Sequence, residues 1–171
     1  MDVRNFTWAD LPELTRLVNS GSSEEDRWLT ESLLREDLAR PGLSPEINCT
    51  LFEEDGTLQA GALIHPEMSI QRMVLQVWIR PNHKVANLER TVVRVGIAHA
   101  ERLGAKVLHT CFPSSQPWLK ILTQEGLFRV RTYWLMRCQE QVNAPGGVPD
   151  GYSIANYKPR DAAMLTKIQN A

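Results

Sequence analysis

The chain has 171 residues, of which 43% are hydrophobic and 23% are charged, and its formal net charge at pH 7 is −1. These values are typical of one globular domain with some chain left over, and they argue against a binding surface for nucleic acid or for an anionic membrane. No apolar run approaches the ~20 residues of a membrane span, and the cysteines are too few and too far apart to predict a disulfide framework or a zinc site. We therefore expect a cytoplasmic protein without a metal.

Hydrophobic periodicity predicts a short strand and two helices at the start of the chain. The strand is expected over residues 2–6, and Thr7 or Asp10 is expected to cap a helix that ends at 19–21. A second helix is predicted from 24 to 39, because its leucines and Trp28 recur on one side.

A hairpin and a longer strand are expected next. Asp55-Gly56 between apolar runs predicts the hairpin turn, since both turn residues need a positive φ. Pro66 is expected to end the second hairpin strand, because proline has no N–H to donate. The strands predicted in this region are 48–54, 57–65 and 73–80.

The strand at 73–80 leads through Pro81 and a polar loop into a long helix. Asn87 is predicted to be its N-cap, and Gly104 is placed where a glycine ends a helix. A strand, a tight loop and a helix N-terminus form a phosphate-binding layout, because the unpaired N–H groups of the first turn point at whatever occupies the loop. After this helix the pattern predicts a strand, a helix and a strand over 105–112, 115–125 and 128–138. The predicted order is therefore β-α-α-β-β-β-α-β-α-β.

The run from Ile79 to Glu89, IRPNHKVANLE, resembles the cofactor loop of the GNAT N-acetyltransferase superfamily. The family pattern is V-x-P-x-x-R/Q-x-x-G-x-G/A. The strand end, the proline and Lys84 match it, whereas Asn87 and Glu89 stand where the family has Gly and Gly or Ala. The resemblance extends to the order of elements over residues 2–140. It implies a GNAT-like acyl-CoA N-acyltransferase fold, an α/β (α+β) fold with a central mixed, mostly antiparallel, twisted sheet flanked by helices.

The resemblance also implies a site for acetyl-CoA. The backbone of Val77 and Ile79 would pair with the pantetheine arm, and the loop would face the diphosphate. The implied cofactor-binding residues are Val77, Ile79, Lys84, Val85, Ala86, Asn87, Leu88 and Glu89. The two departures weaken this site, because small residues let the backbone approach the phosphates and Glu89 would bring a carboxylate towards them.

The catalytic residues of the family have no clear counterpart here. The usual acid is a tyrosine in the pattern N-x-x-A-x-x-x-Y-x-x-x-G-F, and the match of Gly126-Leu127 to its end puts Leu122 at the tyrosine position. Leucine cannot donate a proton, so the catalytic residues stay unknown.

Candidate bases lie near the central strand, but none of them is compelling. Glu67 is a candidate, and Gln76 cannot act as a base. His109 in an apolar strand is interpreted as a structural histidine, and His83 as a solvated loop histidine.

The end of the chain repeats its beginning. Residues 152–171 align with residues 1–20 at a constant offset of 151. The identical pairs are Asn5/Asn156, Asp10/Asp161, Leu14/Leu165, Thr15/Thr166 and Asn19/Asn170. One interpretation is that any strand, cap and helix share this pattern, and the favoured one is that a second copy of the domain begins here. The chain is then expected to be a piece of a longer protein.

The predicted organisation is a GNAT-like domain over 1–142, a linker over 143–151 and the first strand and helix of a second GNAT-like domain over 152–171. This arrangement resembles tandem GNAT proteins of the mycothiol-synthase type. Apolar residues of the last segment would be exposed unless they dock on the first domain or on a neighbouring protomer. These residues are Ile154, Tyr157, Leu165 and Ile168.

Three functions compete on this basis. The favoured one is part of an acetyl-CoA-dependent N-acetyltransferase that acts on a small-molecule primary amine, with this N-terminal domain not independently catalytic. The alternatives are a non-catalytic acyl-CoA-binding, structural or regulatory domain, and a binding module that keeps only the fold. Fold resemblance alone does not separate them.

Overall fold

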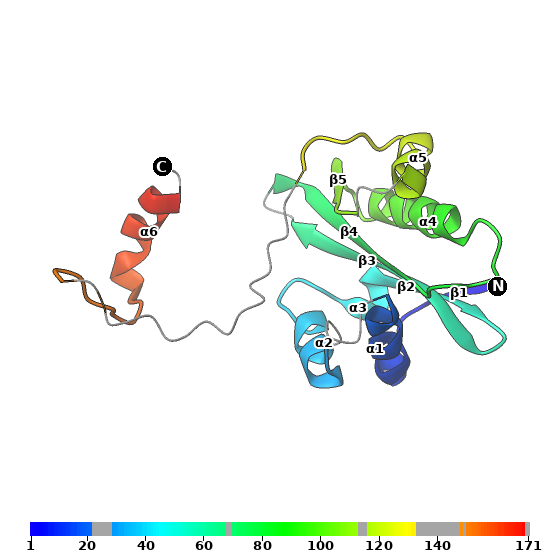
Figure 1. Cartoon of the computed structure of the whole chain (residues 1–171), viewed down its shortest axis with the longest axis horizontal. Coiled ribbons are helices and arrows are strands. Elements are labelled where there is room, and N and C mark those ends of the chain that lie inside the picture. The colour runs from blue at the N-terminus through cyan, green and yellow to red at the C-terminus, as the bar shows by residue number, and fades with distance from the viewer. Residues whose placement is uncertain (22–28, 68–69, 113–115, 133–147, 149, 170–171) are drawn as a thin grey trace. The chain divides into compact units, whose positions relative to one another are not determined.

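The structure is a computed structural model that describes residues 1–21, 29–67, 70–112, 116–132, 148 and 150–169. The chain forms two compact units, Met1–Val130 and Arg131–Ala171 (Figure 1). In the described ranges no helix is long and apolar enough to cross a membrane. The predicted domain limits at 142 and 151 stay predictions.

The first unit is a mixed five-stranded sheet with helices on both faces (Figure 1). Its order is β1-β2-β3-β4-β5, with antiparallel pairing except between β4 and β5, which are parallel. The strands are β1 Asp2–Asn5, β2 Cys49–Glu54, β3 Thr57–Glu67, β4 Arg72–Ile79 and β5 Val107–Thr110. The predicted α+β fold with a mixed, mostly antiparallel sheet is confirmed.

Two hydrophobic cores lie on the two faces of this sheet. Helices α1 and α2 cover one face and α4 and α5 the other (Figure 1). The helices with described bounds in the first unit are η1 Trp8–Asp10, α1 Leu11–Ser20, α2 Glu31–Leu38, α3 Pro45–Asn48, α4 Leu88–Arg102 and α5 Gln116–Gln124. Leu14 and Leu34 bury in the core under α1 and α2, and Leu75 and Val92 bury in the core under α4. Burying a leucine contributes about 1.5–3 kcal/mol, so these two cores hold the layers together.

The second predicted helix is shorter than expected. It was predicted over 24–39, but α2 begins at Glu31 because Thr30 caps it: the Thr30 side chain accepts a hydrogen bond from the Leu33 N–H. Residues 22–28 lie outside the described part of the chain. The short helix α3 was not predicted.

Pro66 does not end β3, which continues to Glu67. Pro66 lies opposite Met73 of β4, and β2 pairs with β3 only as far as Leu63. The backbone of Pro66 faces the side where β2 has already ended, so its missing N–H costs no ladder hydrogen bond. The prediction that Pro66 ends the strand was wrong, because it did not consider whether the backbone of Pro66 faces β2 or β4.

The strand predicted over 128–138 is not formed in its described part. Residues 127–132 have no regular structure, and Phe128 and Val130 are exposed. Residues 133–138 lie outside the described residues. Alternation of side chains is not enough for a strand, which also needs a neighbour to bond its N–H and C=O groups.

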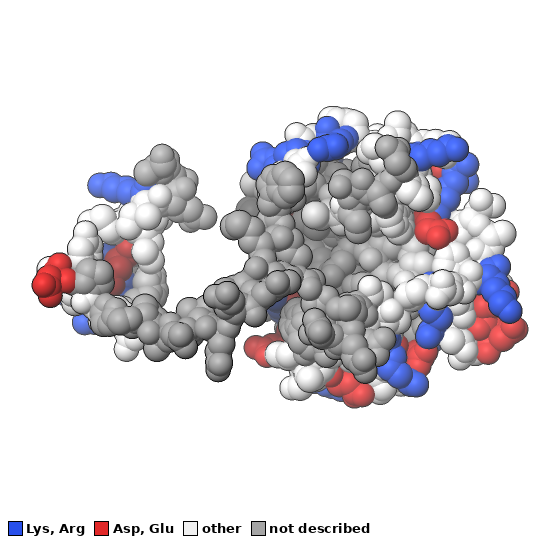
Figure 2. All heavy atoms as spheres, in the orientation of Figure 1, with Lys and Arg blue, Asp and Glu red and all other residues white. Residues whose placement is uncertain are grey.

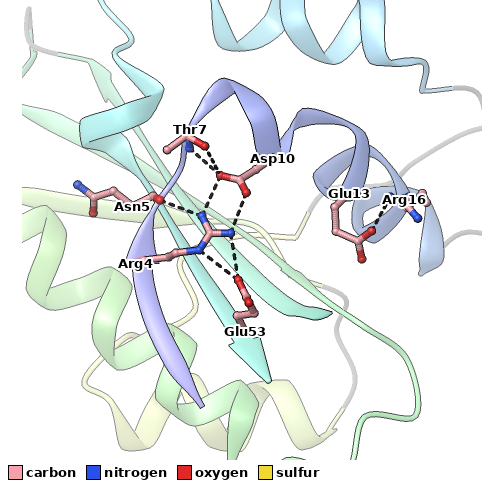
Figure 3. Close-up of polar contacts among 7 residues, drawn as sticks. All are labelled: Arg4, Asn5, Thr7, Asp10, Glu13, Arg16 and Glu53. Carbon is pink, nitrogen blue, oxygen red and sulfur yellow. Dashed lines mark hydrogen bonds and ion pairs between the residues drawn. The ribbon is translucent and has the colours of Figure 1, made fainter. Parts of the chain in front are cut away.

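A charged clamp fixes the start of α1 against the sheet (Figure 3). Arg4 of β1 donates to both carboxylate oxygens of Asp10 at 2.7 and 2.8 Å and to Glu53 of β2 at 3.1 Å. Asp10 also accepts from the Thr7 N–H at 2.7 Å. The hydrogen bond from Arg4 is the main reason why the pKa of Asp10 is lowered. These groups line a polar hollow of about 600 Å³, and their charges are matched in pairs, so we assign them a structural role.

Arg4→Met is expected to lower the free energy of unfolding at pH 7 by about 1–2 kcal/mol, because it leaves Asp10 partly buried without its cation. A lowered pKa means that the clamp stabilises the fold above the unfolded pKa of about 3.9, and that this contribution is lost as the pH falls through the folded pKa. The difference between variant and wild type should therefore shrink in urea unfolding on acidification from pH 7. Arg16→Met removes an arginine that is 71% exposed and is expected to change stability by less than about 0.5 kcal/mol. A difference in the free energy of unfolding between Arg4→Met and wild type that is the same at all pH values would contradict the stabilising role of the clamp.

The second unit reproduces the local geometry at the start of the first. It contains η4 Pro159–Asp161 and α6 Ala162–Gln169. The Thr7 and Lys158 N–H groups donate to the carboxylates of Asp10 and Asp161 at 2.7 and 2.9 Å. In return, the Asp10 and Asp161 N–H groups donate to the carbonyls of Thr7 and Lys158 at 2.9 and 2.8 Å. The aligned positions thus make the same hydrogen bonds.

Inside the two helices the correspondence continues. The Thr15 and Thr166 hydroxyls donate to the carbonyls four residues earlier, at 2.8 and 2.9 Å. The predicted strand of the second copy is not formed, since residues 152–158 have no regular structure. A strand without a partner leaves its backbone groups unpaired. The proposed docking of this segment stays a prediction.

Candidate functional site

Strand β4 extends beyond the point where its pairing with the parallel strand β5 ends. The pairing of β4 with β5 runs from Arg72 opposite Val107 to Leu75 opposite Thr110. The Thr110 hydroxyl closes this pairing by donating to the Leu75 carbonyl at 2.8 Å. β4 continues to Ile79 and stays paired with β3 on its other side. Beyond Leu75 it therefore presents an edge that no described strand covers.

The backbone of Val77 and Ile79 faces this edge. The Arg80 N–H donates to the carbonyl of Gln59 in the line of β3 at 2.8 Å, so even-numbered residues of β4 bond to β3. Odd-numbered residues then turn their N–H and C=O groups the other way. The Leu75 carbonyl, bonded by the side chain of β5, follows this rule. An extended ligand could pair with the backbone of 77 and 79 as an added strand does.

Two residues of the loop from 80 to 87 have a left-handed backbone conformation. Asn82 and Asn87 both have φ +57°, a conformation that glycine adopts freely and that asparagine tolerates better than most residues. Asn87 is the N-cap residue of α4, as predicted, but its side chain makes no capping hydrogen bond. Its carbonyl instead accepts from the Thr91 N–H and hydroxyl, both at 3.0 Å. Asn87 thus adopts a left-handed backbone conformation that glycine would also adopt at this position.

The carboxylate of Glu89 is held by a histidine of the loop. The His83 Nε2 lies 3.0 Å from the Glu89 Oε1, and the His83 side chain is only 12% exposed. The interpretation of His83 as a solvated loop histidine was wrong, because position 83 folds back onto the first turn of α4. Among the implied loop residues, Lys84 keeps an exposed side chain and Leu88 is fully buried, so Leu88 offers only its backbone.

Helices α4 and α5 are joined by ion pairs beside this loop. Arg90 and Arg94 of α4 donate to Glu125, which follows α5, at 2.5 and 3.1 Å. The hydrogen bonds from Arg94 and Arg90 lower the pKa of Glu125 to about 2. Figure 2 shows Lys and Arg gathered along the upper edge of the first unit, where α4 and α5 lie, and mixed charges over α1 and α2.

A cleft of about 550 Å³ lies on the opposite face of the sheet, between α1, α2 and β4. Its apolar lining is Val18, Leu29, Leu33, Leu34 and Trp78, and its polar lining is Asn19, Glu36, Asp37, Arg40 and Gln76. Gln76 and Trp78 alternate along β4 with Val77 and Ile79, whose backbone faces the uncovered edge. The cleft and the edge therefore meet on the same four-residue stretch of β4.

Histidines and a carboxylate gather on the same sheet face as the cleft. His65 of β3 lies opposite Val74 of β4, which lies opposite His109 of β5, so the two histidines share one row. The His65 Nε2 lies 3.1 Å from the Gln76 Oε1. Glu67 is bonded by Arg72, the main cause of its lowered pKa, with smaller contributions from His109 and His65. His65 was missed at the sequence level, where only the register of the predicted hairpin against β4 could have found it.

No group of three or more His, Cys, Asp or Glu in the described ranges is arranged to hold a metal ion. Leu122, at the position where the GNAT pattern has a tyrosine, lies half-buried on α5.

By sequence, no known protein family matches the chain and no curated protein is similar enough to match. Solved structures do match. The ribosomal-protein-alanine N-acetyltransferase of Brucella melitensis matches with a TM-score of 0.60 at 20% identity, over 74% of this chain and 83% of that one. The glucosamine-6-phosphate N-acetyltransferase of Arabidopsis thaliana matches with a TM-score of 0.56 at 12% identity, over 81% and 98%. The fold is a GNAT fold.

A third solved structure is longer than the matched region. The GCN5-related N-acetyltransferase of Sphaerobacter thermophilus has a TM-score of 0.59 at 19% identity, and the match covers 73% of this chain but 42% of that one. At such identities the shared property is the GNAT fold itself. In this GNAT fold, the uncovered edge of β4 and the loop before α4 are the elements that the sequence resemblance had singled out.

Proposed function

We propose that the protein is an acyl-CoA-dependent N-acetyltransferase, or part of one, that acts on a small-molecule primary amine. The observation that carries the proposal is the edge of β4 beyond Leu75, in a GNAT fold, next to the N-terminus of α4. The backbone groups of Val77 and Ile79 at this edge suit the amides of a pantetheine arm. The N–H groups of the first turn of α4 suit a diphosphate.

Three features of the loop suit such a cofactor. Asn87 keeps the left-handed backbone, Lys84 offers an exposed cation, and the carboxylate of Glu89 is bonded by His83. Arg80 is not assigned to the cofactor site, since its side chain donates a hydrogen bond to Glu13 at 2.9 Å. When bound, acetyl-CoA supplies the acetyl group as a thioester. The chain itself binds and orients through β4 and the start of α4.

We also propose that residues 152–169 begin a second copy of the GNAT unit, as in tandem GNAT proteins of the mycothiol-synthase type. The matched hydrogen bonds of the aligned segments support this. So does the exposure of its apolar residues: Tyr157 and Ile168 are 61% and 66% exposed, whereas the aligned Phe6 and Leu17 are 1% exposed. The partner would be the rest of that second domain or a neighbouring protomer.

A second candidate function is acyl-CoA binding without turnover. Leu122 favours it, because no proton donor stands at the position of the family's usual acid. In that case catalysis would belong to the second copy, and this unit would have a structural or regulatory role. The cytoplasmic location stays a prediction.

A thermal-shift titration with acetyl-CoA, followed by calorimetry, tests the proposed function. A ligand at 100 times its Kd stabilises by about 2.7 kcal/mol, which moves Tm by about 2–8 °C for a domain of this size. A saturable shift is expected. No shift up to millimolar acetyl-CoA would overturn the proposal for this unit. A shift without transfer to any amine in a screen would favour the second candidate.

Glu89→Gly is expected to strengthen acetyl-CoA binding by about two- to tenfold, because it removes a carboxylate from the proposed diphosphate site and frees the backbone to approach. Calorimetry of the variant measures the change. Glu101→Gly at the other end of α4 is the matched control, because it is the same substitution in the same helix far from the loop. Equal affinities of Glu89→Gly and wild type would count against the assignment of the loop.

A further inference from the structure

We propose that His83 is a positioning residue that holds the carboxylate of Glu89 away from the N–H groups at the start of α4, and so keeps this end of the helix open to the diphosphate of an acyl-CoA. This role rests on the proposed function. It accounts for the presence of a carboxylate in this chain where the GNAT pattern has glycine or alanine.

The first turn of α4 has backbone donors that no group of the described chain accepts. The Thr91 N–H donates to the Asn87 carbonyl at 3.0 Å, but no hydrogen bond among the described residues uses the N–H groups of 88, 89 and 90. The side chain of Asn87 does not cap them. Such groups attract an anion, because they form the positive end of the helix dipole. The anion can come from a ligand or from the chain itself.

Glu89 is the anion of the chain that is nearest to these donors. It is the second residue of α4, and a carboxylate in the first turn ordinarily interacts with the helix N-terminus. Here its Oε1 lies 3.0 Å from the His83 Nε2, which is the one hydrogen bond of this carboxylate among the described residues. A carboxylate only accepts, so the Nε2 carries the hydrogen and donates it. The bond therefore holds Glu89 at the loop instead of at the N–H groups of its own helix.

The ring of His83 is buried for the sake of this one polar contact. Its side chain is only 12% exposed, and its Nδ1 is buried without a hydrogen-bond partner among the described residues. Buried polar atoms are ordinarily bonded, so the position of the ring is not explained by the bonding of Nδ1. The left-handed residue Asn82, with φ +57°, directly precedes His83 where the loop folds back to α4. Backbone and side chain thus both bring the Nε2 to Glu89.

The other cations near the loop do not hold this carboxylate. The Arg90 Nε donates to Glu125 at 2.5 Å, on the side of α5. Lys84 is exposed, and no ion pair joins it to Glu89 in the described part of the chain. His83 is therefore the residue that decides where the Glu89 carboxylate lies.

The first test is a double-mutant cycle on acetyl-CoA binding. His83→Leu removes the donor at similar size and is expected to weaken binding about tenfold, because the released carboxylate turns to the N–H groups that the diphosphate needs. In a Glu89→Gln background the same substitution should change Kd by less than about twofold, since no charge is left to compete. Calorimetry measures all four proteins. A loss of equal size in both backgrounds, or no loss in either, would overturn the inference.

Two further variants separate positioning from packing. His83→Gln keeps an N–H donor that can reach Glu89, so it should restore the affinity to within about threefold of the wild type. Glu101→Gln makes the same change as Glu89→Gln at the other end of α4, and in that background His83→Leu should keep its full effect. Circular dichroism confirms that the variants are folded. A His83→Gln protein that binds as weakly as His83→Leu would assign the ring a packing role and overturn the inference.

The second test needs no cofactor. In amide NMR spectra recorded on acidification from pH 7, protonation of Glu89 should leave the Leu88 and Arg90 signals of the wild type nearly unmoved. In His83→Leu at least one of these signals should follow the titration, because its N–H now bonds the carboxylate, and Glu89→Gln should abolish this movement. Wild-type signals that already follow it, or variant signals that do not, would overturn the inference. Failure of the wild type to bind acetyl-CoA would instead overturn the proposed function, while the NMR result still decides the position of Glu89, so the two failures are distinguishable.

Discussion

Leu14→Ala is expected to lower the free energy of unfolding of the first unit by about 2–5 kcal/mol, whereas Leu165→Ala is expected to cost less than about 0.5 kcal/mol. The two leucines occupy the same position in the aligned segments, and they lie in the corresponding helices α1 and α6. Leu14 is fully buried in the core with Phe6 and Leu17, and Leu165 is 50% exposed. The pair therefore separates the effect of burial from the effect of local sequence.

Urea unfolding followed by circular dichroism measures both variants, with the slope of the transition as a check that the unfolded state is unchanged. The control is built into the comparison, since each variant removes the same atoms from an equivalent helix. A loss for Leu165→Ala as large as that for Leu14→Ala would show that α6 is buried against another surface. That result would support the predicted docking of residues 152–169.

Gly96→Val is expected to destabilise the first unit by about 1–3 kcal/mol, because it overpacks the core between α4 and β4. A Cβ atom at Gly96 would lie 2.7 Å from the Cδ1 of Leu75, closer than real side chains approach. Leu75 is also the last residue of β4 that pairs with β5. A shift of Leu75 should therefore disturb the start of the uncovered edge, and acetyl-CoA binding should weaken as stability falls.

Gly21→Ala is the matched glycine control, because nothing lies within 4 Å of an added Cβ and the backbone is in the right-handed region with φ −84°. It should change stability by less than about 0.5 kcal/mol. Thermal and urea unfolding measure stability, and calorimetry measures acetyl-CoA binding. A Gly96→Val protein as stable as the wild type would mean that α4 and β4 have room that the packing does not show.

Local signals account for the parts of the fold that the sequence predicted well. Asp55 and Gly56 have φ +49° and +72°, as the hairpin turn requires, and Gly104 has φ +86° after α4. Each depends on residues within a few positions along the chain, so a single sequence contains the information. The likeness of the aligned segments is local in the same sense, because each cap and helix contains its own hydrogen-bonding groups.

The candidate site depended on register, which pairs residues far apart in the sequence. The direction of the Val77 backbone follows from which neighbour β4 bonds, and the same rule explains why Pro66 is tolerated inside β3. The pair of His65 and Gln76 needs two strands in one alignment, and a shift by one residue would put them on opposite faces. The contact of His83 with Glu89 arises only when the loop folds back.

The amino-acid sequence by itself determined the order of the elements from β1 to α5 apart from the short α3, the turn and helix-end glycines and the position of the loop before α4. These features are set by side-chain periodicity and by backbone conformations that few residues adopt. Only the tertiary structure decided where β4 extends beyond the described part of β5, which backbone groups face that edge and which histidine contacts Gln76. The physical reason is that β-sheet pairing alternates with a period of two, so the function of a residue on β4 depends on neighbours that its own segment does not contain.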